Sequence, residues 1–163
     1  MSKFLRTIRF DRSDELLFDL AARPGEWAVS GAFAFADATA AGMISPQEQQ
    51  AFESGFLGLE SFGRSTFASV ASAPPEQIAE IELALARHFV DRYGAPDLDS
   101  ARVAARDEIA FIVDLVAGAR IGTVFSVARH RDEPDRITEE FRAANASTGN
   151  LQGRLWTFEP DEP

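Results

Sequence analysis

The sequence predicts an α+β domain with three parts: an antiparallel sheet that begins as an N-terminal β-meander, two long central helices packed on it, and C-terminal strands. Strand-like patterns occupy residues 3–36 and 122–142, while residues 75–117 have the apolar spacing of two helices. Strands, then helices, then strands again are typical of α+β folds, whereas a doubly wound parallel sheet needs regular alternation. We expect one domain at residues 1–144. Residues 145–163 then form a linker and an acidic tail that can add an edge strand.

The N-terminal region alternates extended segments and turns. Residues 3–10 are rich in β-branched and aromatic side chains, which favour a strand. In residues 15–21 three apolar side chains are expected on one face: Leu16, Phe18 and Leu20. A type II turn follows, because Pro24 fixes φ at its second position and Gly25 tolerates a positive φ at its third.

Residues 26–36 predict a strand with two unlike faces. One face carries bulky side chains that fill a core, namely Trp27, Val29, Phe33 and Phe35. The other carries only small side chains, namely Ala28, Ser30, Ala32, Ala34 and Ala36. A face of small residues permits close approach by another element. That element is either a helix of the same chain, which we favour, or a second subunit.

The next elements are marked by capping residues. Ser45, Pro46 and Glu48 form a capping box with proline at the first helical position, so a short helix begins there. Residues 61–72 then predict a strand.

Two long helices and the C-terminal strands complete the pattern. The first helix occupies residues 75–93, between a proline pair and a glycine. The second begins at a cap that is either Asp97 or Asp99. Residues 136–142 are either the antiparallel mate of the strand at 122–130 or a short helix.

Composition argues against several classes of partner. A net charge of −10 over 163 residues opposes nucleic acid, whose recognition depends on clustered lysine and arginine. The chain has no cysteine, which excludes disulfides and cysteine-type zinc sites. Its most apolar stretch, residues 109–118, is too short to cross a membrane. We therefore expect a cytoplasmic protein with neither a nucleic-acid nor a membrane partner.

No residue pattern predicts catalysis, a metal site or a cofactor. His88 and His130 are far apart and belong to no H-x-x-x-H or H-x-H pair, and no glycine-rich segment has phosphate-binding spacing. Glu108 lies beside the apolar stripe of the second long helix, where burial would make it a candidate acid–base group. The favoured interpretation is a solvated helix face on which Glu108 pairs with Arg102 and Arg106.

Two arginines on apolar strand faces form the best candidate site. Arg6 lies in the first strand and Arg64 in the strand predicted at 61–72. Such an arginine must reach solvent, pair with a carboxylate or hold an anion. If the two strands are neighbours, both guanidinium groups converge on an anionic ligand, although pairing with an internal Asp or Glu is favoured. The candidate ligand-binding residues are Arg6, Trp27, Phe62, Arg64 and His130.

Several short segments carry a family resemblance: Phe4-Leu5-Arg6-Thr7-Ile8-Arg9, residues 24–33 (PGEWAVSGAF), Gly55-Phe56-Leu57-Gly58, residues 61–66 (SFGRST), Tyr93-Gly94-Ala95-Pro96 and Glu108-Ile109-Ala110-Phe111. In these the chain resembles a family of small acidic bacterial proteins known only as a domain of unknown function. The likeness covers about residues 3–142, and the tail from Asn145 looks like an addition. The resemblance implies no activity, cofactor or catalytic residue. It implies an accessory role, through an association with gene clusters that mature molybdenum-dependent redox enzymes.

These observations favour a non-enzymatic accessory or interaction protein, with a role in the maturation of a redox enzyme. Its expected partner is another protein or a second copy of itself, joined through an edge strand at Leu155 to Phe158. The alternative is a small anionic-ligand-binding protein, or an enzyme, that uses Arg6 and Arg64.

Overall fold

A computed structural model describes residues 2–35, 45–133, 136–143 and 151–157. The strands are β1 (Ser2–Ile8), β2 (Trp27–Val29), β3 (Phe56–Gly58), β4 (Arg64–Ser65), β5 (Phe67–Ala73), β6 (Val124–Glu133), β7 (Arg136–Ala143) and β8 (Leu151–Thr157). Within the described residues they form one eight-stranded sheet in the order β4-β3-β2-β1-β5-β6-β7-β8. All its neighbouring strands are antiparallel. The predicted α+β class with an N-terminal meander is therefore confirmed.

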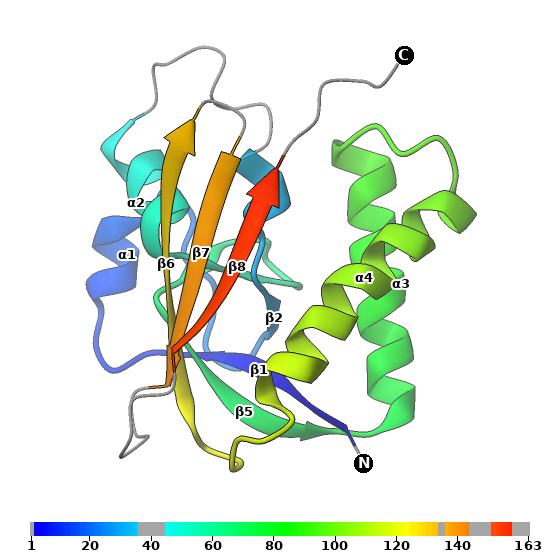
Figure 1. Cartoon of the computed structure of the whole chain (residues 1–163), viewed down its shortest axis with the longest axis horizontal. Helices are drawn as coiled ribbons and strands as arrows, with labels where there is room; N and C mark the ends of the chain where they lie inside the picture. The colour runs from blue at the N-terminus through cyan, green and yellow to red at the C-terminus, as the bar shows by residue number, and fades with distance from the viewer. Residues whose placement is uncertain (1, 36–44, 134–135, 144–150, 158–163) are drawn as a thin grey trace.

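The helices lie on both sides of the strands β6 to β8 (Figure 1). They are α1 (Ser13–Leu17), the 3₁₀ helix η1 (Ala32–Phe35), α2 (Pro46–Ser54), α3 (Pro75–Arg92) and α4 (Leu98–Val116). The long helices α3 and α4 pack against each other and against the sheet through β5, β1 and β2, whereas α2 packs against β6. Among the described residues, no helix has the length and apolar character needed to span a membrane.

The predicted helix boundaries are confirmed. At the start of α2 the Ser45 hydroxyl accepts from the Glu48 amide (3.1 Å), and the Glu48 carboxylate accepts from the Ser45 amide (2.9 Å). Asp97, rather than Asp99, caps α4 by accepting from the Ser100 amide. The core stripe of α3 consists of the buried residues Ile81, Leu85 and Phe89, which lie at helical spacing.

Two C-terminal predictions are settled by strand pairing. Residues 136–143 form β7, the antiparallel mate of β6, and not a helix. β8 then pairs with β7 at the edge of the sheet, as expected for the strand predicted near the C-terminus. The linker predicted at 145–150 and residue Phe158 lie outside the described residues.

The prediction of one long strand at residues 26–36 is wrong. β2 ends at Val29, and Gly31 then takes a left-handed conformation with φ of +79° before η1 begins. A Cβ at Gly31 would lie 2.6 Å from the Arg64 Nη1, so only glycine lets the backbone pass this close to the arginine. Small residues of this segment are nevertheless fully buried within the chain, namely Ala28, Ser30 and Ala32. The chain itself therefore covers them, in part through α4, which packs against β2.

Two further segments differ from their predictions. Residues 61–72 form two strands, β4 and β5, because at the break Thr66 turns its amide and hydroxyl to the buried carboxylate of Asp14 (3.3 and 2.7 Å). The apolar face predicted in residues 15–21 does not form. The chain is helical up to Leu17 and extended at Phe18, so alternate residues do not point to the same side. As a result Phe18 is buried, whereas Leu16 is 80% and Leu20 54% exposed.

Candidate functional site

A pocket of about 820 Å³ lies between the C-terminal half of α3 and the loop that joins β3 to β4. Its volume falls within the range of roughly 300–1,000 Å³ that is usual for small-molecule sites. The lining residues are Leu20, Leu57, Leu59, Ser61, Phe62, Arg64, Ala84, Arg87, His88, Asp91, Arg92 and Tyr93. It contains three arginines against one aspartate, so its formal charge is +2 in a chain of net charge −10.

Arg64 is the buried cation of this pocket. It is 8% exposed, and its two terminal nitrogens donate to the backbone carbonyls of Gly55 and Gly31 (3.2 Å each). Within the part of the chain that the structure describes, no carboxylate forms an ion pair with it. Burial, and next the positive charge of Arg129, lower the pKa of Arg64 from its ordinary value to about 9. The guanidinium is therefore still charged at neutral pH, but its charge is poorly compensated.

A second buried arginine explains this lack of compensation. Arg129, on β6, donates from Nε to the Glu139 carboxylate (2.7 Å), and both side chains are completely buried. Its other nitrogens donate to Ser30 and to the carbonyls of Ala51 (3.3 Å), Phe52 (2.9 Å) and Gly55 (3.0 Å). Ser30 in turn donates to the same carboxylate. Glu139 is thus engaged by Arg129 and Ser30, which leaves Arg64 as the uncompensated charge.

An aromatic ring shields the two buried arginines together. The ring centroid of Phe35, in η1, lies 4.7 Å from the Arg64 Cζ and 5.7 Å from the Arg129 Cζ. Both distances permit cation–π attraction, which is stronger where water is excluded. The short 3₁₀ helix that replaced the predicted strand therefore places a residue that stabilises the pair.

The wall formed by α3 is polar and aromatic. Asp91 lies about one helical turn from both Arg87 and His88, so the three side chains lie on one side of α3, beside its core stripe. The His88 ring stacks on Phe62, with centroids 3.8 Å apart and an interplanar angle of 8°. Partial burial, and next the nearby Arg92, lower the pKa of His88, so the imidazole is neutral at pH 7. Arg92 also offsets the partial negative charge at the end of α3.

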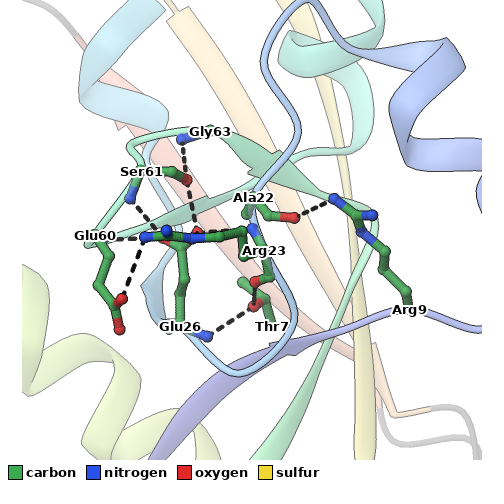
Figure 2. A network of polar contacts seen from close by, with 8 residues as sticks. All are labelled: Thr7, Arg9, Ala22, Arg23, Glu26, Glu60, Ser61 and Gly63. Carbon is green, nitrogen blue, oxygen red and sulfur yellow. Dashed lines mark hydrogen bonds and ion pairs between the residues drawn. The ribbon is translucent and has the colours of Figure 1, made fainter.

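The opposite wall is held in place by a buried carboxylate. Glu26 accepts hydrogen bonds from the Arg23 amide (2.7 Å), the Glu60 amide (2.9 Å) and both the amide (2.9 Å) and hydroxyl (2.6 Å) of Ser61 (Figure 2). Thr7 closes the network by accepting from the Glu26 amide (3.0 Å). Burial raises the pKa of Glu26, but these hydrogen bonds outweigh burial and lower it below the ordinary value of 4.5. Glu26 therefore stays ionised and fixes the loop that carries Phe62.

The backbone of Phe62 is strained within this fixed loop. Its φ of +59° makes it, among the described residues, the one non-glycine residue with a positive φ. For a bulky residue this conformation costs about 1–2 kcal/mol, and such strain tends to occur at functional sites. The hydrogen bonds of Glu26 to the two preceding residues are what hold it there.

The strain at Phe62 predicts an unusual order of stability. Phe62→Ala and Phe62→Gly both lose the stack on His88, but only glycine adopts the positive φ without strain. We expect Phe62→Gly to be more stable than Phe62→Ala by about 1 kcal/mol in urea unfolding, the reverse of the usual order. The same pair at Phe67, a strand residue of β5, is the control and should favour alanine. A more stable Phe62→Ala would show that the loop relaxes.

The structure brings together only part of the predicted site. Phe62 and Arg64 both line the pocket. Arg6 does not, because β2 and β3 separate its strand from β4, and its exposed guanidinium lies 4.0 Å from the centre of the Trp27 ring. Trp27 donates to Gln77 (2.8 Å) outside the pocket. His130 is exposed on β6, also outside the pocket.

Sequence reasoning missed the α3 half of the pocket and the buried partner of Arg64. The helical spacing of Arg87, His88 and Asp91 can be read from the sequence. Polar residues at this spacing also occur on any solvent-exposed helix face, so the pattern did not indicate a pocket. The favoured prediction for Glu108, a solvated position paired with Arg102 and Arg106, is wrong because Glu108 is buried. Arg102 and Arg106 pair instead with Glu82 of α3 (3.0 and 3.1 Å). Across the described ranges, no three His, Cys, Asp or Glu side chains are grouped so as to hold a metal ion.

Comparison with known proteins places the chain in a family. A profile described as a family of unknown function (DUF6505) matches residues 1–155. The chain belongs to this family. The resemblance to a family of unknown function is thereby confirmed. The match extends beyond residue 142, so the tail up to residue 155 is part of the family pattern and not an addition. No curated protein and no solved structure matches the chain.

Proposed function

We propose that this member of the family binds a small anionic ligand in the pocket between α3 and the β3–β4 loop, with Arg64 as the principal anion-binding group. The observation that carries the proposal is a buried guanidinium with no carboxylate partner among the described residues, at a pocket of about 820 Å³. Arg87 and Arg92 add two further positive charges at the same pocket. Arg6, which was expected to be the second anion-binding group, has no part in this site.

Electrostatics supports binding over a purely structural role for Arg64. A buried, unpaired charge lowers the stability of the folded chain, and an anion that enters the pocket offsets that cost. A guanidinium with two nitrogens held by fixed carbonyls is also preorganised, so little side-chain entropy is lost when the anion binds. The anion therefore stabilises the folded state by an amount that increases with its concentration and its affinity.

The test is the effect of anions on thermal unfolding at constant ionic strength. We expect sulfate and inorganic phosphate to raise the melting temperature by several degrees relative to chloride, and Arg64→Met to abolish the difference. Arg6→Ala is the matched control, because Arg6 is an arginine of the same sheet outside the pocket, and it should keep the full effect. If Arg64→Met does not fold, Arg87→Gln takes its place. It should reduce the rise in melting temperature in sulfate and phosphate by at least about half. Equal melting temperatures in chloride, sulfate and phosphate would refute the proposal.

An accessory role through protein contacts is the second candidate, and exposed apolar side chains support it. Leu16 and Leu17 are exposed on α1, and Phe10 is exposed shortly before it. In Figure 1, α1 lies on the opposite side of the strands β6 to β8 from α3 and α4. Several exposed apolar side chains in one short segment favour a protein partner. A crosslinking pull-down from native cells should recover a partner with the unaltered chain and lose it with Leu16→Glu. Recovery of no protein, or of the same proteins with both chains, would exclude this role.

A further inference from the structure

We infer that the ligand of this pocket is an amphipathic organic acid: one anionic group that faces Arg64, joined to an apolar body of at least one ring or branched chain. The inference rests on the proposed anion site and specifies its ligand class. It follows from the mixture of apolar and cationic side chains that line the pocket.

The pocket combines apolar side chains with charged ones. The apolar side chains Leu57, Leu59 and Phe62 come from β3 and the loop after it, and Leu20 comes from the segment after α1. Arg64 of β4 lies on that same side, whereas α3 and its C-cap contribute Ala84, Arg87, His88, Asp91, Arg92 and Tyr93. A ligand that fills the pocket therefore meets both apolar side chains and cationic groups.

The size of the pocket excludes a bare ion as its full occupant. A volume of about 820 Å³ suits a ligand of drug size, whereas sulfate or phosphate fills only a small part of it. Leu20 is largely exposed at this pocket although it is apolar. An apolar ligand body removes Leu20 from water, which an inorganic ion does not.

The position of Phe62 indicates an aromatic or similarly flat body. Phe62 and His88 already form a stacked pair, and Tyr93 meets His88 edge-on at 5.3 Å. His88 thus belongs to an aromatic cluster at the pocket, and a flat ligand body can extend this cluster while its anionic group binds Arg64. The strained backbone of Phe62 keeps its ring at this wall before any ligand arrives, which reduces the entropy lost on binding.

The test compares matched probes by isothermal titration calorimetry on the full chain. The probes are acetate, 2-naphthoate and 2-naphthamide, with inorganic phosphate and 1-naphthyl phosphate as a second pair that separates carboxylate from phosphate head groups. We expect 2-naphthoate to bind at least about tenfold more tightly than acetate, because it buries an apolar body, and 2-naphthamide to bind at least about tenfold more weakly than 2-naphthoate, because it has no charge.

Two variants link the result to the pocket. Phe62→Gly should remove most of the advantage of 2-naphthoate over acetate, whereas Val103→Ala, which truncates an exposed apolar residue of α4, should leave it unchanged. Equal binding of acetate and 2-naphthoate, both dependent on Arg64, would overturn this inference and leave the anion site standing. Binding that does not depend on Arg64, or none at all, would overturn both.

Discussion

Glu139→Gln is expected to lower the free energy of unfolding by about 3–5 kcal/mol, a large share of the roughly 5–15 kcal/mol that stabilises a domain. Glu139 is completely buried and receives Arg129 Nε at 2.7 Å and the hydroxyl of Ser30. Glutamine keeps the shape but removes the negative charge that pairs with Arg129 and also favours the charged form of Arg64 at longer range. The mutual repulsion of Arg129 and Arg64 would then be less compensated.

Urea unfolding at pH 7 measures this loss, and Glu82→Gln is the matched control. Glu82 is also a glutamate that binds arginines, but its partners Arg102 and Arg106, on α4, are 39% and 61% exposed. Its replacement should cost at most about 1 kcal/mol. A similar small loss for Glu139→Gln would mean that the two buried arginines are compensated by groups other than this carboxylate.

Glu26→Gln is expected to cost about 2–4 kcal/mol and to loosen the β3–β4 loop. Both carboxylate oxygens of Glu26 accept from two donors each, and three of these four donors are backbone amides. Whichever way the glutamine amide is turned, its NH₂ group faces donors, so buried amides lose their acceptor. Because the loop carries Phe62, we also expect the variant to bind the anions of the pocket more weakly.

The pH dependence of stability provides a second readout for Glu26. Its pKa in the folded chain lies below the ordinary value of 4.5, so its contribution is complete above that value and is lost as the pH falls through the folded pKa. Glu26→Gln should therefore flatten the fall in stability below pH 4.5. Glu15→Gln is the comparison: hydrogen bonds from Arg12 and Arg9 also lower the pKa of Glu15, but that carboxylate is exposed, so the flattening there should be smaller. A flattening of equal size in both variants would contradict the assignment to Glu26.

Local signals in the sequence predicted the helices and the fold class well. The capping box at Ser45 and the turn at Pro24-Gly25 appear as expected, because caps and turns depend on a few adjacent residues. The prediction of a strand at 26–36 was wrong because the end of this strand depends on a long-range contact. What ends it is the close approach of Arg64 to Gly31, a contact between residues 33 positions apart that no local pattern records.

The candidate site was only half predictable for the same reason. An arginine beside apolar residues identified Arg64, since a charge on a buried strand needs a special environment. The prediction that Arg64 and Arg6 converge on one ligand was wrong, because the sheet order places β2 and β3 between their strands, β4 and β1. Arg129 and Glu139, ten residues apart on β6 and β7, look like ordinary strand residues until the hairpin places them side by side in the core.

The contacts of Arg129 with α2 have a consequence for how the protein opens. The carbonyls of Ala51, Phe52 and Gly55 lie at the C-terminal end of α2, where the partial negative charge of a helix is concentrated. A nine-residue helix is only marginally stable in isolation. Unwinding α2 would, however, remove three hydrogen-bond acceptors from Arg129 and take the partial negative charge of the helix end away from Arg129 and Arg64. The amide protons of α2 should therefore exchange with solvent only when the β6–β7 hairpin also opens, so helix and hairpin form one cooperative unit.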